Sequence, residues 1–266
     1  MKDIIILKSK DQKSTVTIEK GELISYQFNM EELMHQKGSL GWENTDTEMF
    51  PIIGPTFANH NKVYTENGVC IQDQHGFLRE LVYKILDSSE NKAIYQKIYK
   101  GNTKIKNNQF PERSKEEFVF WTYDFTFKKS FEINNKSLKI HFEILSENGM
   151  PFMLGYHPAF KLSGNLTEYC MVNNKKITIQ NVIDKGGPSF PFFDLDEISL
   201  IKEHGYSVKV KASGFKNIML WTEVDNMICI EPITHYPDLE KQSYSKKNLR
   251  TSNGKELFTV EIIPFQ

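Results

Sequence analysis

The chain is poor in cysteine, which removes several functional classes. Its 266 residues contain three cysteines, Cys70, Cys170 and Cys229, an odd number with no Cys-x-x-Cys pair. Neither a disulfide framework nor a structural zinc ribbon is indicated, because both need paired cysteines at short spacing. We expect buried free thiols in a reducing compartment. A catalytic cysteine has no specific support.

A charge surplus and long apolar runs are also missing. The chain has 33 Lys and Arg residues against 34 Asp and Glu residues, a formal net charge of −1. Nucleic-acid-binding proteins usually carry a basic surplus, so no nucleic-acid partner is predicted. The apolar run from Ile4 to Leu7 is too short for a signal-peptide core, and no run approaches a membrane span. We therefore expect a cytoplasmic protein without a membrane partner.

Motifs for nucleotides, serine nucleophiles and metals are absent as well. The sequence has no G-x-G-x-x-G, P-loop or G-x-S-x-G motif. The side chains best suited to a metal are His75, His157, His235 and Glu231. They are far apart and include no His-x-His or His-x-x-x-His pair, so no metal site is predicted. Two glycosidase-type carboxylates stay open as an alternative, because Asp194, Asp196 and Glu231 exist but nothing marks a pair.

Alternation of apolar and polar residues dominates the sequence. The two clearest alternating runs, 121–127 and 138–144, flank the turn signal Asn134-Asn135-Lys136 and predict a hairpin. Glu147-Asn148-Gly149 is the next turn signal. Further strand-like runs are Thr15–Ile18, Ala93–Tyr99, Lys176–Gln180, Ser207–Val210, Ile218–Trp221, Met227–Ile230 and Leu257–Ile263.

Helical periodicity is scarce. Only Glu31–His35 and Lys241–Arg250 could hold a helical turn or two, and the polar stretch from Lys100 to Glu117 is expected to be a long surface loop. Many short strands with few helices predict an all-β protein with a β-sandwich architecture. No linker divides the chain, so residues 1–266 are expected to form a single domain.

Three short motifs could carry chemistry: Gln74–Arg79, Gly155–Phe160 and Ile230–Pro232. In the last two, His157 and Glu231 each precede a proline, which favours extended backbone before it. Prolines tend to lie at strand ends or bulges, which often border active sites. The alternative is that these prolines only terminate strands.

The first motif combines His75 with Arg79 around Gly76. If this segment is extended, His75, Phe77 and Arg79 share one face. The alternative is a loop in which Arg79 forms a salt bridge with a neighbouring carboxylate. Together with His157 and Glu231, these residues form a plausible acid–base set. The aromatic residues that could pack on a sugar ring are Trp42, Phe77 and Tyr156, although core packing is the commoner fate of an aromatic side chain.

The order of these motifs resembles the aldose 1-epimerase family, the galactose mutarotase-like proteins, and within it the bacterial branch associated with lactose operons. The resemblance runs over nearly the whole chain. Its segments are Gly21–Ser25, Trp42, Phe50–Gly54, Gln74–Arg79, Gly149–Phe152, Gly155–Phe160, Leu220–Thr222 and Cys229–Pro232.

The resemblance implies a β-supersandwich and a cofactor-free isomerase that interconverts the α and β anomers of a hexose such as galactose. It implies Glu231 as the general base and His157 as the acid at the ring oxygen. It further implies that His75 holds the sugar and assists, and that Arg79 binds or orients it. An acidic side chain that binds sugar hydroxyls is also implied, with Asp196 preferred over Asp194. A sugar is then the expected partner, and the chain a monomer or homodimer.

Two positions depart from the family pattern and leave the substrate open. Pro55 stands where the family commonly has arginine after Phe-Pro-x-x-Gly, and Ile233 replaces the tryptophan after Glu-Pro. One alternative is a hexose-6-phosphate mutarotase, which needs a cationic pocket to which Arg79, Lys161 and Lys84 could contribute. Another is a non-catalytic sugar-binding protein, because fold alone does not fix function.

Overall fold

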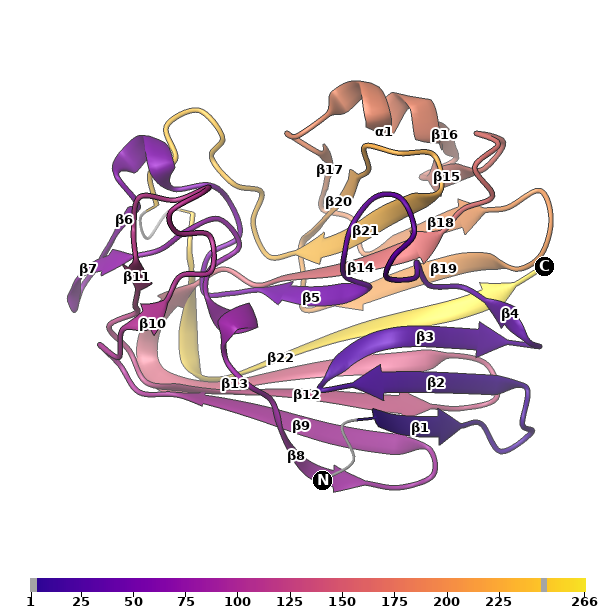
Figure 1. Ribbon diagram of the computed structural model, residues 1–266, viewed down its shortest axis with the longest axis horizontal. Coiled ribbons are helices and arrows are strands. Elements are labelled where there is room, and N and C mark those ends of the chain that lie inside the picture. The colour runs from indigo at the N-terminus through magenta and orange to yellow at the C-terminus, as the bar shows by residue number, and fades with distance from the viewer. Residues whose placement is uncertain (1–3, 245–247) are drawn as a thin grey trace.

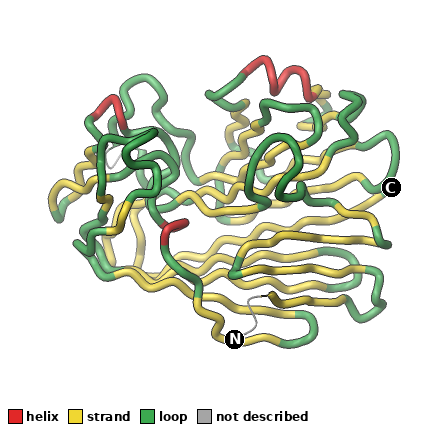
Figure 2. Tube along the Cα trace, in the orientation of Figure 1, coloured by secondary structure: helices red, strands yellow, loops and turns green. Residues whose placement is uncertain are grey.

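A computed structural model describes residues 4–244 and 248–266. Strands make up most of this part of the chain, which holds a single α-helix, α1 (Ile179–Lys185) (Figures 1 and 2). None of the described helices has the length and apolar character needed to cross a membrane. The expected all-β class is confirmed.

The largest layer is a nine-stranded sheet whose pairs are all antiparallel. Its strands, in spatial order, are β16 (Lys175–Thr178), β15 (Tyr169–Val172), β18 (Glu197–Ile201), β19 (Ser207–Ser213), β22 (Arg250–Phe265), β13 (Leu138–Phe152), β12 (Phe125–Ile133), β9 (Lys92–Tyr99) and β8 (Lys84–Ser88). Strict alternation of buried and partly exposed residues along β12 reflects one face turned to the core.

A five-stranded sheet lies over part of this layer (Figure 1). Its strands, in order, are β17 (Phe190–Phe193), β20 (Asn217–Trp221), β21 (Met227–Ile233), β14 (Gly155–Lys161) and β5 (Asp46–Met49). Every residue of β21 is buried, and so is every residue of β14 except Lys161. Both faces of these central strands are therefore covered, which explains their nearly continuous apolar sequence.

Smaller elements complete the fold. A four-stranded sheet contains β1 (Ile4–Lys8), β2 (Ser14–Glu19), β3 (Glu22–Phe28) and β4 (Glu31–Glu32). Two-stranded ribbons are formed by β6 (Lys62–Thr65) with β7 (Gly68–Ile71) and by β10 (Ile105–Lys106) with β11 (Phe118–Val119). Two 3₁₀ helices are η1 (Phe57–Asn59) and η2 (Leu78–Glu80).

An aromatic core joins the two large sheets. The ring of Tyr156 in β14 lies 5.1 Å from that of Phe142 in β13, and Phe50, just after β5, lies 4.9 Å from Phe125 in β12. Such ring pairs add to the apolar burial that holds layers together. The predicted sandwich of packed sheets is confirmed.

The local predictions have mixed outcomes. The hairpin around Asn134–Lys136 is confirmed, and Asn134 caps the turn by accepting hydrogen bonds from the amides of Lys136 and Ser137. The predicted turn at 147–149 is wrong: β13 continues through it with register shifts against β22, so these residues form an irregularity within a strand.

The helix predictions were also wrong where they can be compared. Glu31 and Glu32 form β4, and the described part of 241–250 contains no helix; residues 245–247 lie outside the described residues. The helix α1 occupies part of the run 176–180 expected to be a strand. Thr178 caps the N-terminus of α1. Its hydroxyl oxygen accepts a hydrogen bond from the backbone amide of Asn181, and the Asn181 side-chain oxygen accepts one from the backbone amide of Thr178. The stretch 100–117 is mostly turns but includes β10.

Candidate functional site

His157 and Glu231 face each other across two neighbouring strands. In the β14–β21 pair, Gly155 lies opposite Ile233 and Ala159 opposite Cys229, which puts His157 opposite Glu231. The His157 Nε2 and Glu231 Oε1 atoms are 3.4 Å apart, and the two side chains are only 8% and 1% exposed. The two groups are close but do not form a hydrogen bond, and both Glu231 oxygens lack a hydrogen-bond partner among the described residues.

Burial shifts the proton affinities of this pair in opposite directions. Burial raises the pKa of Glu231 well above its ordinary value. Burial, with the nearby His75 and Arg79, lowers the pKa of His157 well below its ordinary value. Both shifts favour the uncharged forms. Moving a proton from the Glu231 carboxyl group to the His157 imidazole would create an ion pair without changing the net charge of the pair.

A tight turn places His75 beside this pair. His75 and Gly76 both have positive φ, 69° and 65°. A Cβ at Gly76 would lie 2.2 Å from the backbone oxygen of Phe50, so only glycine fits. The His75 amide donates to the oxygen of Ile53, and its Nδ1 lies 2.9 Å from the same atom. The His75 ring is 5.9 Å from that of His157.

The protonation state and the hydrogen-bonding role of His75 follow from its surroundings. Burial and the charge of Arg79 lower its pKa to about 3, so the imidazole is neutral near pH 7. A neutral ring that donates from Nδ1 to a carbonyl oxygen keeps Nε2 as an acceptor. His75 can therefore accept a hydrogen bond from a hydroxyl group.

Arg79 brings an incompletely paired cation to the same region. It lies in η2, and its Nε and Nη2 atoms are buried with no hydrogen-bond partner among the described residues. Its charge contributes to the lowered pKa values of His75 and His157. Of the two conformations considered for residues 75–79, the structure has a turn at His75 and Gly76 followed by η2, and not an extended strand.

Two tryptophans pack against His157. The Trp42 ring centroid lies 4.3 Å from that of His157, and the Trp221 centroid 5.9 Å from it. Trp42 is held by its loop: its oxygen lies 2.7 Å from His35 Nε2. Trp221 was absent from the predicted site. The alternation of β20 could have indicated it. Met219 and Trp221 lie on one face of that strand and pair with Glu231 and Cys229 of β21.

Three other predicted site residues are not brought to this group. Phe77 is fully buried in the core, with its ring 4.7 Å from that of Tyr99. Tyr156 precedes His157 in β14 and therefore points to the opposite face, where its hydroxyl donates to Asp46. Asp196 is exposed just before β18 and lines a cavity of about 290 Å³ on the nine-stranded sheet.

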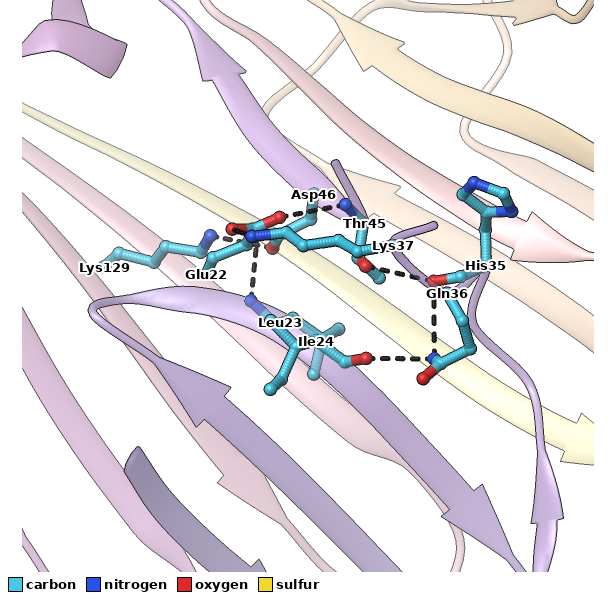
Figure 3. Close-up of polar contacts among 9 residues, drawn as sticks. All are labelled: Glu22, Leu23, Ile24, His35, Gln36, Lys37, Thr45, Asp46 and Lys129. Carbon is cyan, nitrogen blue, oxygen red and sulfur yellow. Dashed lines mark hydrogen bonds and ion pairs between the residues drawn. The ribbon is translucent and has the colours of Figure 1, made fainter. Parts of the chain in front are cut away.

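Beneath the site lies a buried charge network. Lys129 Nζ contacts Asp46 Oδ2 at 2.7 Å and Glu48 Oε1 at 2.6 Å, and all three side chains are at most 3% exposed. The amide of Leu23 donates to the other Asp46 oxygen (Figure 3). Asp46 and Glu48 belong to β5, Lys129 to β12 and Leu23 to β3. The network therefore ties the strand beside β14 to two other sheets.

The two carboxyl groups of this network respond differently to burial. Burial raises the pKa of Asp46 to about 6 even beside Lys129. Burial also opposes ionisation of Glu48, but the charges of Lys129 and Lys97 outweigh it and lower the pKa of that carboxyl. Lys129 is the cation common to both, so it compensates most of the buried negative charge.

The loop that carries Trp42 is anchored on the same side. The side chain of Thr45 donates to the His35 oxygen, and the Thr45 amide donates to Glu22 (Figure 3). The Gln36 amide group donates to the Ile24 oxygen of β3. These contacts fix the base of the 33–45 loop against the four-stranded sheet and so hold Trp42 over His157.

Comparisons with known proteins agree with this architecture. The sequence matches the aldose 1-epimerase family over residues 21–240. A galactose mutarotase-like protein from Lactobacillus casei superposes with a TM-score of 0.79 at 16% identity, covering 98% of this chain and 100% of that one. A galactose mutarotase related enzyme from Lactobacillus acidophilus gives 0.75 at 15% identity, covering 99% and 97%.

A protein from an animal has the same fold. An aldose epimerase homologue from C. elegans superposes with a TM-score of 0.67 at 9% identity, covering 99% of this chain and 98% of that one. No curated protein matched the sequence. At these identities the solved structures establish the galactose mutarotase-like sandwich fold, and the family match extends over most of the sequence. The chain belongs to the aldose 1-epimerase family.

Proposed function

We propose that this protein is a cofactor-free mutarotase that interconverts the α and β anomers of a free hexose, with Glu231 as general base and His157 as general acid. The observation that carries the proposal is the buried pair of His157 and Glu231 with a 3.4 Å gap between the two groups. A carboxylate whose two oxygens have no hydrogen-bond partner within residues 4–244 and 248–266 is available to a substrate proton.

The reaction needs one proton removed and one delivered. Glu231 takes the proton of the anomeric hydroxyl while His157 protonates the ring oxygen. The bond between C1 and the ring oxygen breaks, its electron pair goes to that oxygen, and C1 becomes an aldehyde. Rotation about the C1–C2 bond and the reverse proton transfers close the ring on the other face. Each assisted transfer typically contributes about 10²–10⁴-fold to the rate.

The proton balance of the free pair suits this cycle. Ring opening leaves Glu231 protonated and His157 neutral, which is the state that burial favours for both groups. The protonation that the protein favours by itself is therefore the one that can close the ring of an open-chain sugar. The opposite distribution of the same proton opens the ring.

The surrounding side chains supply sugar-binding groups. His75 can accept a hydrogen bond from a sugar hydroxyl at Nε2, and Arg79 can donate from its Nε and Nη2 atoms, which have no hydrogen-bond partner among the described residues. Trp42, and Trp221 with it, offer aromatic faces next to His157. Aromatic rings pack on the apolar face of a pyranose, and this contact excludes water from the reacting centre.

The test is mutarotation of freshly dissolved α-glucose and α-galactose, followed by optical rotation or by the anomeric proton signals. We expect acceleration above the buffer rate that is lost in Glu231→Gln. Glu168→Gln is the matched control, because Glu168 is also buried but binds the amide and hydroxyl of Ser163. Retention of full activity in Glu231→Gln would remove Glu231 as the base.

A phosphorylated hexose is the second candidate substrate. Arg79 favours it, because two of its buried donors, Nε and Nη2, have no hydrogen-bond partner in the described part of the chain. Of the two lysines considered with it, Lys161 follows His157 and Ala159 on the same face of β14, whereas Lys84 lies in the edge strand β8 of the other sheet. Competition of glucose 6-phosphate against glucose separates the two substrates. Sugar binding without acceleration of either would indicate a non-catalytic sugar-binding protein.

A further inference from the structure

A thiol, an imidazole and a carboxylate converge on the site face of the five-stranded sheet. Cys229 and Glu231 are two residues apart in β21 and so project from the same face, and His157 lies opposite Glu231 in β14. One ligand atom from each, Sγ, a ring nitrogen and a carboxylate oxygen, lie within 4.8 Å of one another. All three residues are buried.

Several polar atoms of this group have no hydrogen-bond partner in the part of the chain that the structure describes. Neither oxygen of Glu231 has a hydrogen-bond partner among the described residues, and His157 Nδ1 has none either. Cys229 is a free thiol. Buried polar atoms are normally paired, so a fully buried carboxylate with two unpaired oxygens indicates a place where something else binds.

The donor set matches a thiophilic divalent cation. Sulfur, imidazole nitrogen and carboxylate oxygen are the ligand types that zinc prefers, and three protein ligands with an open fourth position form a common zinc arrangement. A thiolate, a carboxylate and a neutral imidazole around a divalent ion give a complex of zero net charge, which suits a buried position. Two ligand atoms of tetrahedral zinc are about 3.5 Å apart. Side-chain movements of about 1 Å would therefore bring the three atoms to coordination distance.

We propose that His157, Cys229 and Glu231 form a binding site for Zn²⁺ or a chemically similar thiophilic cation. The ion takes the place of the thiol proton of Cys229, because the thiolate is the form that binds a metal. Binding therefore releases protons and strengthens as pH rises. The positive charge of Arg79, which is felt at His157, opposes it. Spacing rules for metal motifs did not predict this site, because His157 is more than 70 residues from Cys229 and Glu231 along the chain.

Occupation of this site would block turnover, an effect that rests on the proposed mutarotase function. The bound ion engages the lone pair of His157 and the carboxylate of Glu231, which are the two groups that move protons. Zn²⁺ is then an inhibitor that competes with the sugar. The binding of the metal itself does not depend on that function and is measured separately.

The test is titration of the metal-free protein with CoCl₂, followed by displacement with ZnCl₂. Thiolate coordination gives cobalt a charge-transfer absorption band in the near ultraviolet, which reports Cys229 directly. The variants are Cys229→Ala and, as a matched control, Cys170→Ala, which removes another buried free thiol in β15. Zinc affinities are measured by calorimetry, and mutarotation is assayed in parallel with and without ZnCl₂.

We expect one cobalt ion per chain and the band in wild type and Cys170→Ala. Cys229→Ala should lose the band and bind zinc at least about tenfold more weakly, as expected for loss of a ligand. If the protein is a mutarotase, zinc should inhibit wild type at concentrations that leave Cys229→Ala active. Unchanged cobalt spectra in Cys229→Ala would overturn the site. So would the absence of binding of either metal up to about 1 mM, because a Kd of that size corresponds to only ~4 kcal/mol. A normal cobalt titration without mutarotation would leave the metal site standing and refute the proposed function alone.

Discussion

Replacing Lys129 with methionine should destabilise the protein far more than the same change at its neighbour Lys128. Both residues lie in β12, and each makes an ion pair of 2.7 Å, Lys129 with Asp46 and Lys128 with Glu143. The difference is burial: the Lys129 pair is 1% and 0% exposed, and the Lys128 pair 32% and 22%. Lys129 also pairs with buried Glu48, so the comparison sets a buried ion-pair network against a partly exposed pair.

The magnitudes follow from what each deletion leaves behind. Lys129→Met leaves Asp46 and Glu48 buried without their shared cation, and a buried pair broken in this way typically costs about 3–5 kcal/mol of unfolding free energy. Lys128→Met leaves Glu143 close to water and still paired with Lys255, so its cost should be within about 1 kcal/mol. The assay is urea unfolding of both variants at the same pH.

The pH dependence gives a second readout of the same argument. Without Lys129, burial raises the folded-state pKa of both carboxyl groups above their unfolded values. The folded state then binds more protons than the unfolded state, so the unfolding free energy falls as pH rises through the folded pKa values. The deficit of Lys129→Met should be larger at pH 7.5 than at about pH 5. Adding Asp46→Asn and Glu48→Gln should recover stability. Equal costs for the two lysine variants would refute the reasoning.

Three further substitutions address the site. His157→Asn should lower kcat for mutarotation by about 10²–10⁴-fold, whereas His141→Asn, at a half-buried histidine in β13, should not; steady-state polarimetry decides. Gly76→Ala should unfold at clearly lower urea concentration than Gly186→Ala, because both have a φ of 65° but only Gly76 lacks space for a Cβ. Trp42→Ala should raise KM for the sugar by about two- to tenfold, as loss of an aromatic contact of about 0.5–1.5 kcal/mol predicts; an unchanged KM would place the sugar elsewhere.

The strand framework was readable from the sequence because period-two alternation records which face of a strand is buried. The β12–β13 hairpin is the clearest case, since its apolar residues alternate strictly and its turn has its own signal at Asn134. The region at 147–149 was misread because a glycine-containing turn signal also suits a bulge, and only the long partner strand β22 shows that β13 continues. Helix α1 was missed because its apolar residues are too few to show a helical period.

The same two-residue period explains which site predictions the structure brings together. Tyr156 and His157 are neighbours in one strand, so they point to opposite faces: Tyr156 joins the buried network of Asp46 and Lys129, and His157 meets Glu231. Alternation alone therefore excluded having both at one site. Alternation also puts Cys229 on the same face as Glu231. Spacing rules for metal motifs do not detect this group, because its third member, His157, comes from another strand. Sequence patterns indicate the face on which a residue lies. The strand that lies opposite is fixed by the pairing of whole sheets, and here that pairing brings together the two groups of the proposed acid–base pair.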